Sequence, residues 1–128
     1  MRKILNIILL ALLLSSCSEY AKLQKSTDPE VKFNAGKNYF QEKKYAKSIT
    51  MFEEIVPYYR GTPQAEELLY LLSESYMGQK DYYSASEYYQ AYLRNFPRGT
   101  YAQEARYKVA YCYYLDSPVA RLDQEATY

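Results

Sequence analysis

The side chains that could carry out acid–base or metal chemistry are few in this chain. Among its 128 residues there is no histidine, which removes the commonest general base and the main nitrogen ligand for zinc or copper. Adjacent carboxylates such as Glu53-Glu54 and Glu66-Glu67 would point about 100° apart on a helix, so they could not act on one substrate atom. We therefore expect no catalytic residues, no metal and no cofactor, and a binding protein rather than an enzyme.

Cys17 stands in a setting that marks it for lipidation. Arg2 and Lys3 precede an apolar run from Ile4 to Leu14, which is typical of a secretory signal peptide and shorter than the roughly 20 residues of a membrane span. Leu14-Ser15-Ser16-Cys17 resembles the bacterial lipobox, so residues 1–16 are expected to be removed and Cys17 to become a lipidated first residue. Several acyl chains would hold a soluble domain at a bilayer. An ordinary signal peptide with a chance cysteine is the alternative.

Residues 17–26 carry no sustained apolar period and are interpreted as a lipidated tether. Ser18 follows the lipidated position, and by resemblance to the sorting rule of well-studied Gram-negative bacteria the absence of Asp there favours the outer membrane, with the protein on its periplasmic face. With Cys17 lipidated, Cys112 has no partner for an intramolecular disulfide and is expected to be a small core residue.

The charge balance bears on possible partners. The chain has 16 Lys and Arg against 15 Asp and Glu, a formal net charge of +1, which lacks the basic excess of proteins that track a phosphate backbone. We therefore expect no nucleic-acid partner. The cluster Lys43, Lys44 and Lys47 could contact anionic lipid or peptide, or could be a solvated helix end.

Eighteen tyrosines, with no tryptophan and four phenylalanines, indicate one environment that recurs along the chain. Tyr39, Tyr76 and Tyr113 are separated by 37 residues each time, and other pairs keep that offset. Within each unit small residues alternate with aromatic ones: Gly36, Tyr39, Tyr45, Ser48 and Phe52 in the first, and Ser73, Tyr76, Tyr82, Ala85 and Tyr89 in the second. The pattern resembles the tetratricopeptide repeat, whose two helices touch at small residues.

The elements that position these side chains are predicted to be helices. The fold class is all-α, a tetratricopeptide-like solenoid wound as a right-handed superhelix, with five full helices and the start of a sixth. The predicted helices are Pro29–Lys43, Tyr45–Tyr59, Pro63–Gln79, Tyr82–Phe96 and Tyr101–Leu115. The predicted caps are Thr27 with Glu30, Thr62 before Pro63, and Thr100 with Gln103.

The repeat domain is expected to span residues 27–128 in units of about 27–61, 62–98 and 99–128. The last unit ends at Tyr128, where a sixth helix should begin. A solenoid exposes the apolar face of its last repeat unless a further helix covers it. We therefore expect the natural sequence to continue beyond Tyr128.

The first helix of each unit would line a concave, aromatic groove. Its predicted residues are Phe33, Lys37 and Phe40 in the first unit, Tyr70, Glu74 and Met77 in the second, and Tyr107, Tyr111 and Tyr114 in the third. Aromatic rings offer large contact areas at low entropic cost, which suits an extended peptide with aromatic side chains. The alternative is that several of these rings only pack against neighbouring helices.

Longer segments resemble the BamD family, the tetratricopeptide lipoproteins of the outer-membrane β-barrel assembly machinery, particularly its Bacteroidetes-like members. The resemblance rests on the lipobox, Asp28–Phe33, Tyr45–Thr62, Ala110–Pro118 and Leu122-Asp123-Gln124. It implies two partners: unfolded outer-membrane β-barrel proteins, and the barrel-forming subunit that carries periplasmic POTRA domains. The second half of that family's repeats, which docks on the POTRA domains, is absent from this sequence.

Two other functions remain open from the sequence. A tetratricopeptide lipoprotein that captures glycans would keep the anchor and the repeats, although such proteins usually stack sugars on tryptophan. A general periplasmic scaffold fits the repeat pattern equally well.

Overall fold

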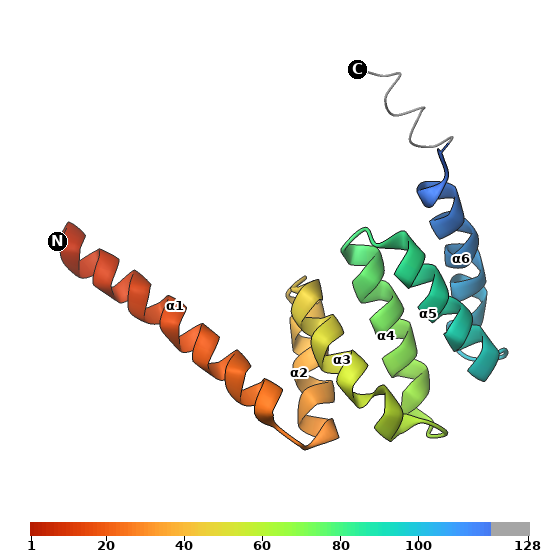
Figure 1. Cartoon of the computed structure of the whole chain (residues 1–128), viewed down its shortest axis with the longest axis horizontal. Coiled ribbons are helices and arrows are strands. Elements are labelled where there is room, and N and C mark those ends of the chain that lie inside the picture. The colour runs from red at the N-terminus through yellow and green to blue at the C-terminus, as the bar shows by residue number, and fades with distance from the viewer. Residues whose placement is uncertain (119–128) are drawn as a thin grey trace.

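Six helices make up the part of the chain that the computed structural model describes, residues 1–118. They are α1 (Arg2–Lys25), α2 (Pro29–Gln41), α3 (Tyr45–Tyr59), α4 (Gln64–Gly78), α5 (Tyr82–Asn95) and α6 (Ala102–Asp116). No strand occurs among the described residues. Helices α2 to α6 stand in a row in which each packs against the next (Figure 1). The row is the predicted helical solenoid, and its five helices lie within two residues of their predicted bounds.

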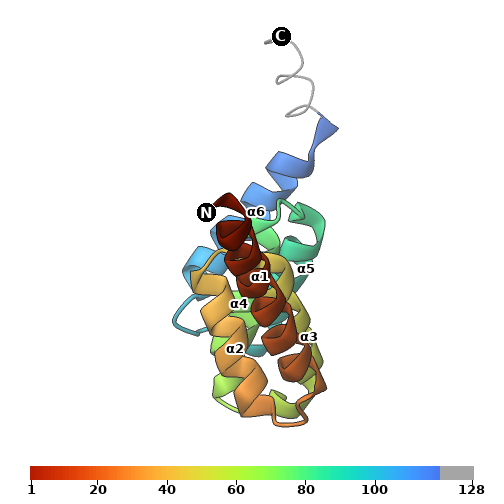
Figure 2. The same cartoon turned by 90° about the vertical axis from the view of Figure 1, so that its left-hand side faces the viewer.

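Helix α1 differs from its prediction. It runs without a break from Arg2 through Cys17 to Lys25, so most of the predicted tether at residues 17–26 is helical before any cleavage. It projects from the α2 end of the row (Figure 1), and in the view turned by 90° it lies in front of the other helices, toward the viewer (Figure 2). By length and composition this helix could cross a membrane, and a signal sequence near the N-terminus meets the same criterion.

The predicted N-caps were wrong. Asp28, not Thr27, caps α2, since its Oδ1 accepts a hydrogen bond of 2.9 Å from the Glu30 amide. Thr62 donates its hydroxyl proton to the Tyr59 carbonyl at the end of α3, so it does not cap α4. Helix α6 begins after Tyr101 with no side-chain cap, and the Thr100 amide instead donates to Glu66. Aspartate accepts well at an N-cap, and a threonine hydroxyl can satisfy a carbonyl instead.

The turn between the two helices of a unit repeats in backbone geometry. Lys43 and Lys80, 37 residues apart, both adopt positive φ, at 58° and 62°. The amide of the next residue donates to the equivalent tyrosine carbonyl in each turn, Lys44 to Tyr39 and Asp81 to Tyr76. Such a left-handed residue closes a helix by satisfying its last carbonyls. The third unit departs from this, because Ser117, the next position in the series, is extended.

Small and aromatic residues meet between the helices as the spacing predicted. A β-carbon on Gly36 would lie 2.5 Å from Phe52 Cε1, so the close approach of α2 to α3 requires glycine. Its counterpart Ser73 is fully buried. Cys112 is 1% exposed, as expected of a core residue, and burial raises the pKa of its thiol to about 11. The predicted start of a sixth helix and the Leu122-Asp123-Gln124 motif lie outside the described residues.

Candidate functional site

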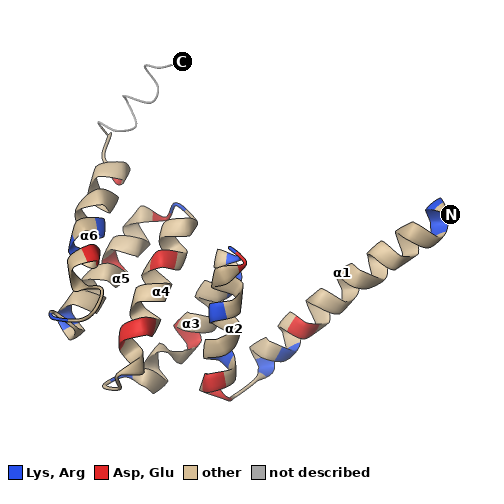
Figure 3. Cartoon of the chain, turned by 180° about the vertical axis from the view of Figure 1, so that it is seen from behind, with Lys and Arg blue, Asp and Glu red and all other residues tan. Residues whose placement is uncertain are grey.

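The predicted groove residues lie on α2, α4 and α6, the first helices of the three units, and we call these nine residues the A-helix face. Ion pairs connect the three helices. Lys37 on α2 approaches Glu67 on α4 at 3.9 Å, and Lys108 on α6 pairs with Glu74 on α4. Charged residues of both signs are scattered over the repeats (Figure 3). The A-helix face itself includes one cation, Lys37, and one anion, Glu74.

In the first unit the ring of Phe33 faces inward. It is 6% exposed and packs against Phe52 and Tyr59, with ring centroids 6.1 and 5.3 Å away. Lys37 covers it, with Nζ 4.6 Å from the ring centroid. Phe40 packs edge-on against Tyr45. Phe33 therefore offers little ring surface to a ligand, while Lys37 and Phe40 are half-buried.

In the second unit Tyr70 is similarly covered. It is 8% exposed and stacks on Tyr101 with centroids 4.0 Å apart and planes 6° apart. Met77 is half-buried and accepts a 3.6 Å contact from the Cys112 thiol. Burial, together with hydrogen bonding to Glu104 and the charge of Glu74, raises the pKa of Tyr70 far above its usual value. Tyr70 is thus part of the packing between units.

The third unit presents open rings. Tyr107, Tyr111 and Tyr114 are 67%, 39% and 58% exposed. Tyr107 stacks on Tyr111 at 6.0 Å and Tyr111 on Tyr114 at 6.5 Å, with interplanar angles of 9° and 18°. Their spacing of four and three residues places them on one side of the helix. These rings form a continuous row of accessible aromatic surface, which we call the tyrosine row; that they bind a peptide stays a prediction.

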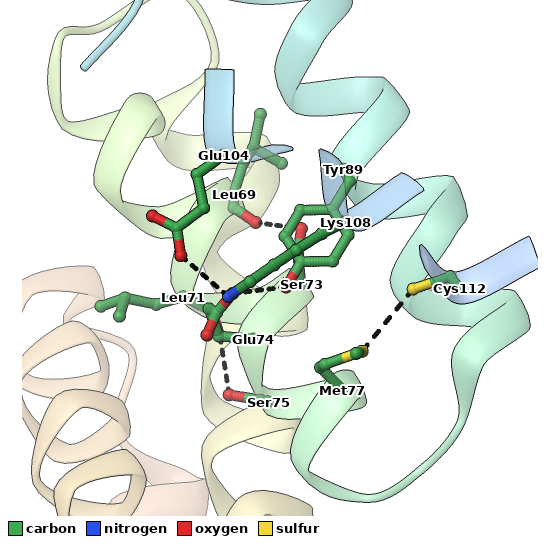
Figure 4. A network of polar contacts seen from close by, with 10 residues as sticks. All are labelled: Leu69, Leu71, Ser73, Glu74, Ser75, Met77, Tyr89, Glu104, Lys108 and Cys112. Carbon is green, nitrogen blue, oxygen red and sulfur yellow. Dashed lines mark hydrogen bonds and ion pairs between the residues drawn. The ribbon is translucent and has the colours of Figure 1, made fainter. Parts of the chain in front are cut away.

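Lys108 is the centre of a polar network that the sequence analysis did not identify (Figure 4). Its ammonium pairs with Glu74 and, at 3.0 Å, with Glu104, and lies over the rings of Tyr70 and Tyr89 at 5.7 and 5.9 Å. Burial lowers the pKa of Lys108, but the hydrogen bonds to Glu74 and Glu104 together with the charges of these two carboxylates outweigh burial and raise it. Hydrogen bonds from Tyr70 and Lys108 lower the pKa of Glu104.

The 37-residue repeat could have pointed to Lys108. In the first two units Lys37 pairs with Glu67. The equivalent residues one repeat later are Glu74 and Glu104, two carboxylates in place of an opposite-charge pair. Two carboxylates meeting at a half-buried interface require a cation, since like charges would repel there. Lys108, four residues after Glu104, is the cation within helical reach.

Besides Glu104, three further glutamates accept hydrogen bonds from tyrosines across the helix interfaces. Glu53 accepts from Tyr76 and Tyr88, Glu74 from Tyr89, and Glu66 from Tyr92 at 2.8 Å. The adjacent residues Glu66 and Glu67 contact different helices, as expected: Glu66 accepts from Tyr92 on α5 and Glu67 pairs with Lys37 on α2. Burial is the largest cause of a raised pKa in each of these tyrosines, and the hydrogen bonds and charges of the glutamates raise it further. The pKa reaches about 12 for Tyr88 and Tyr92. These hydroxyls hold the helices together and are un-ionised at neutral pH.

A cleft of about 720 Å³ is lined by residues of α3, α4 and α5. Its lining includes Val56, Leu68, Leu69 and Phe96, with Arg60 as the one cation. Its volume falls in the range of small-molecule sites. Within residues 1–118, no group of three His, Cys, Asp or Glu side chains is arranged to hold a metal ion.

Comparison with known protein families identifies the repeat. Residues 67–99 match the family model described as a tetratricopeptide repeat, and they cover most of α4, all of α5 and the following turn. A search of curated proteins found no match. The chain therefore contains a tetratricopeptide repeat within an all-helical solenoid, a scaffold of the kind that generally mediates protein–protein binding and is typically non-catalytic.

Proposed function

We propose that the chain is an outer-membrane lipoprotein of the β-barrel assembly machinery, similar to BamD. Anchored through Cys17 on the periplasmic face, it binds unfolded β-barrel proteins and scaffolds their insertion together with the barrel-forming subunit that carries POTRA domains. The proposal takes the anchor and partners from the sequence resemblance. The observation that carries the binding role is the tyrosine row of Tyr107, Tyr111 and Tyr114, whose accessible stacked rings suit an extended, aromatic-rich peptide.

Peptide binding tests the role of the tyrosine row. Labelled peptides from the C-terminal strands of barrel proteins are titrated with the purified chain, with fluorescence anisotropy as the readout. Tyr107→Ala and Tyr111→Ala should each weaken binding about tenfold, the loss of one aromatic anchor in an interface. Tyr83→Ala is the matched control, because Tyr83 is also 67% exposed but lies on α5. If Tyr83→Ala weakens peptide binding as much as Tyr107→Ala does, the tyrosine row is not the peptide-binding site.

Intact mass spectrometry tests the anchor independently. The protein extracted from membranes should have lost residues 1–16 and gained the mass of a diacylglyceryl group and an acyl chain on Cys17. Cys17→Ser should abolish the modification and release the domain from the membrane fraction or leave its precursor uncleaved. An unmodified Cys17 in the membrane-extracted protein would exclude lipidation.

A glycan-capturing lipoprotein and a general periplasmic scaffold are the competing functions. Aromatic rings that stack with one another can also stack on sugars. Oligosaccharide binding that depends on Tyr107 and Tyr111, with no peptide binding, would therefore favour glycan capture. If the chain binds neither the peptides nor the oligosaccharides, the general scaffold is favoured.

A further inference from the structure

Burial begins near the end of α1, at Tyr20, four residues after the last residue of the proposed signal peptide, and continues to the C-cap Ser26. Every residue from 1 to 19 is exposed, whereas Tyr20, Leu23 and Ser26 are half-buried. Their spacing of three residues places them on one side of a helix. The part of α1 that would be removed thus makes no packed surface, and the part that would be retained packs against the first repeat.

Two sets of contacts fix the retained segment. The ring of Tyr20 meets Tyr39 edge-on, with centroids 5.9 Å apart at 78°. The ammonium of Lys47 lies 5.0 Å from the Tyr20 centroid and 5.5 Å from that of Tyr39. Tyr20 therefore joins α2 and α3, and a cation over two rings strengthens the contact.

The second set involves Lys32, which is 8% exposed. Its Nζ donates to the Gln24 carbonyl at 3.2 Å and pairs with Glu54 on α3. A cation is favourable beside the last carbonyls of a helix, where the helix dipole is negative. Lys32 thus closes the end of α1 against the first repeat while its charge is neutralised by Glu54.

The repeat shows what this segment replaces. Tyr76 donates to Glu53 on the second helix of the unit before it, and one repeat later Tyr113 accepts 2.8 Å from Gln90 at the equivalent position. Tyr39 is the first member of this series and has no preceding unit. It meets Tyr20 on α1 instead. Tyr20 in the retained part of α1 therefore supplies to Tyr39 the neighbour that the preceding unit supplies to Tyr76 and Tyr113.

We propose that residues 17–25 form a cap helix, docked on the first repeat through Tyr20 and Lys32, that closes the N-terminal end of the solenoid. Terminal repeats need such a polar cover. Its further consequence rests on the proposed lipidation: Cys17 would be held at a fixed place, about 12 Å along the helix from Lys25 at 1.5 Å per residue, and the repeats at a fixed orientation to the membrane. A flexible tether would fix neither.

Hydrogen exchange tests the cap helix. The full chain is expressed with its signal sequence, purified in detergent, and its backbone amides at 21–25 are followed by mass spectrometry. A helix this short is marginal in water alone, so protection there reports docking. Tyr20→Ala should accelerate exchange roughly tenfold or more at 21–25 and leave α4 and α5 protected. Lys22→Ala, on an exposed neighbouring position, should change little.

Lys47→Met is a second test variant, because it removes the cation over the Tyr20 ring without changing the sequence of α1. It should also accelerate exchange of the amides at 21–25. Wild-type amides that exchange at unstructured rates, or equal exchange in Tyr20→Ala and Lys22→Ala, would overturn the cap helix. The intact mass of the same sample reports lipidation separately. A flexible segment in lipidated protein therefore refutes the cap alone, and a docked segment in unlipidated protein refutes only the anchor.

Discussion

Lys108 neutralises two carboxylates that the repeat brings together at one interface. Its ammonium reaches Glu74 and Glu104, and the side chains of Lys108 and Glu74 are only 19% and 20% exposed. Removing the cation would leave Glu74 half-buried beside a second carboxylate, and an unpaired charge in such a place is costly. The residue thus allows a Glu to stand where the previous unit has Lys37.

Lys108→Met should lower the free energy of unfolding by about 2 kcal/mol at neutral pH, because the apolar stem is kept and the charge is lost. Urea denaturation followed by circular dichroism measures it. Adding Glu74→Gln should recover part of the loss. Arg94→Met is the control, since Arg94 is exposed on α5; a loss as large in Arg94→Met as in Lys108→Met would contradict the network.

Helix α2 approaches α3 at Gly36, where a single methyl group has no room. A β-carbon there would meet Phe52, which is fully buried and cannot move aside. Gly36→Ala should lower the free energy of unfolding by about 1–2 kcal/mol, after the better helix propensity of alanine offsets part of the clash. Asn34→Ala, on the exposed side of α2, should be neutral or slightly stabilising. Thermal denaturation of both variants measures the difference, and equal stability would show that the helices can separate freely.

The turns between paired helices place lysines in the left-handed region. Lys43 and Lys80 have φ of 58° and 62°, a conformation that costs a non-glycine residue about 1 kcal/mol. Lys80→Gly should therefore raise the free energy of unfolding by up to about 1 kcal/mol, whereas Glu87→Gly, at an exposed position in the middle of α5, should lower it by a similar amount. Chemical denaturation measures the change in the free energy of unfolding for both variants. A Lys80→Gly variant less stable than the parent would mean that the lysine side chain is needed in the turn.

The helices themselves could be predicted from the sequence because their signals are local. Small and aromatic residues recur at helical spacing, and the 37-residue offset of Tyr39, Tyr76 and Tyr113 aligned the units. The caps were missed because Thr27 and Asp28 are both good candidates, and only the observed hydrogen bond distinguishes them. The burial of Phe33 and Tyr70 and the role of Lys108 depend on contacts among three helices, which spacing within one helix does not reveal.

At the scale of the whole molecule, tyrosine hydroxyls connect the helices, both within the second unit (Tyr89 to Glu74) and between units (Tyr76 and Tyr88 to Glu53). Burial raises the pKa of Tyr88 and Tyr92 to about 12 and that of Tyr70, Tyr76 and Tyr89 further. The unfolded chain would release these protons near the ordinary tyrosine value of 10.0. Because the folded state binds them more tightly, stability is complete below pH 10 and is lost as the pH rises above it.

The free energy of unfolding should fall by at most about 1.4 kcal/mol per pH unit for each such tyrosine, between pH 10 and the pKa of that tyrosine in the folded state. Tyrosinate absorbance and far-ultraviolet circular dichroism, followed together against pH, measure this. We expect a group of tyrosines to ionise in one cooperative step with loss of helix. Complete tyrosine ionisation while the helices persist would show that these hydroxyls do not hold the units together.

The central claim is that the chain works as a membrane-anchored scaffold for β-barrel assembly. Affinity purification of a tagged full-length version of the protein from detergent-solubilised outer membranes, followed by mass spectrometry, tests it most directly. The account predicts stoichiometric recovery of a barrel-forming protein with POTRA domains, and substoichiometric barrel proteins that diminish in the Tyr107→Ala variant. Recovery of a nutrient transporter, or of no membrane partner, would contradict it.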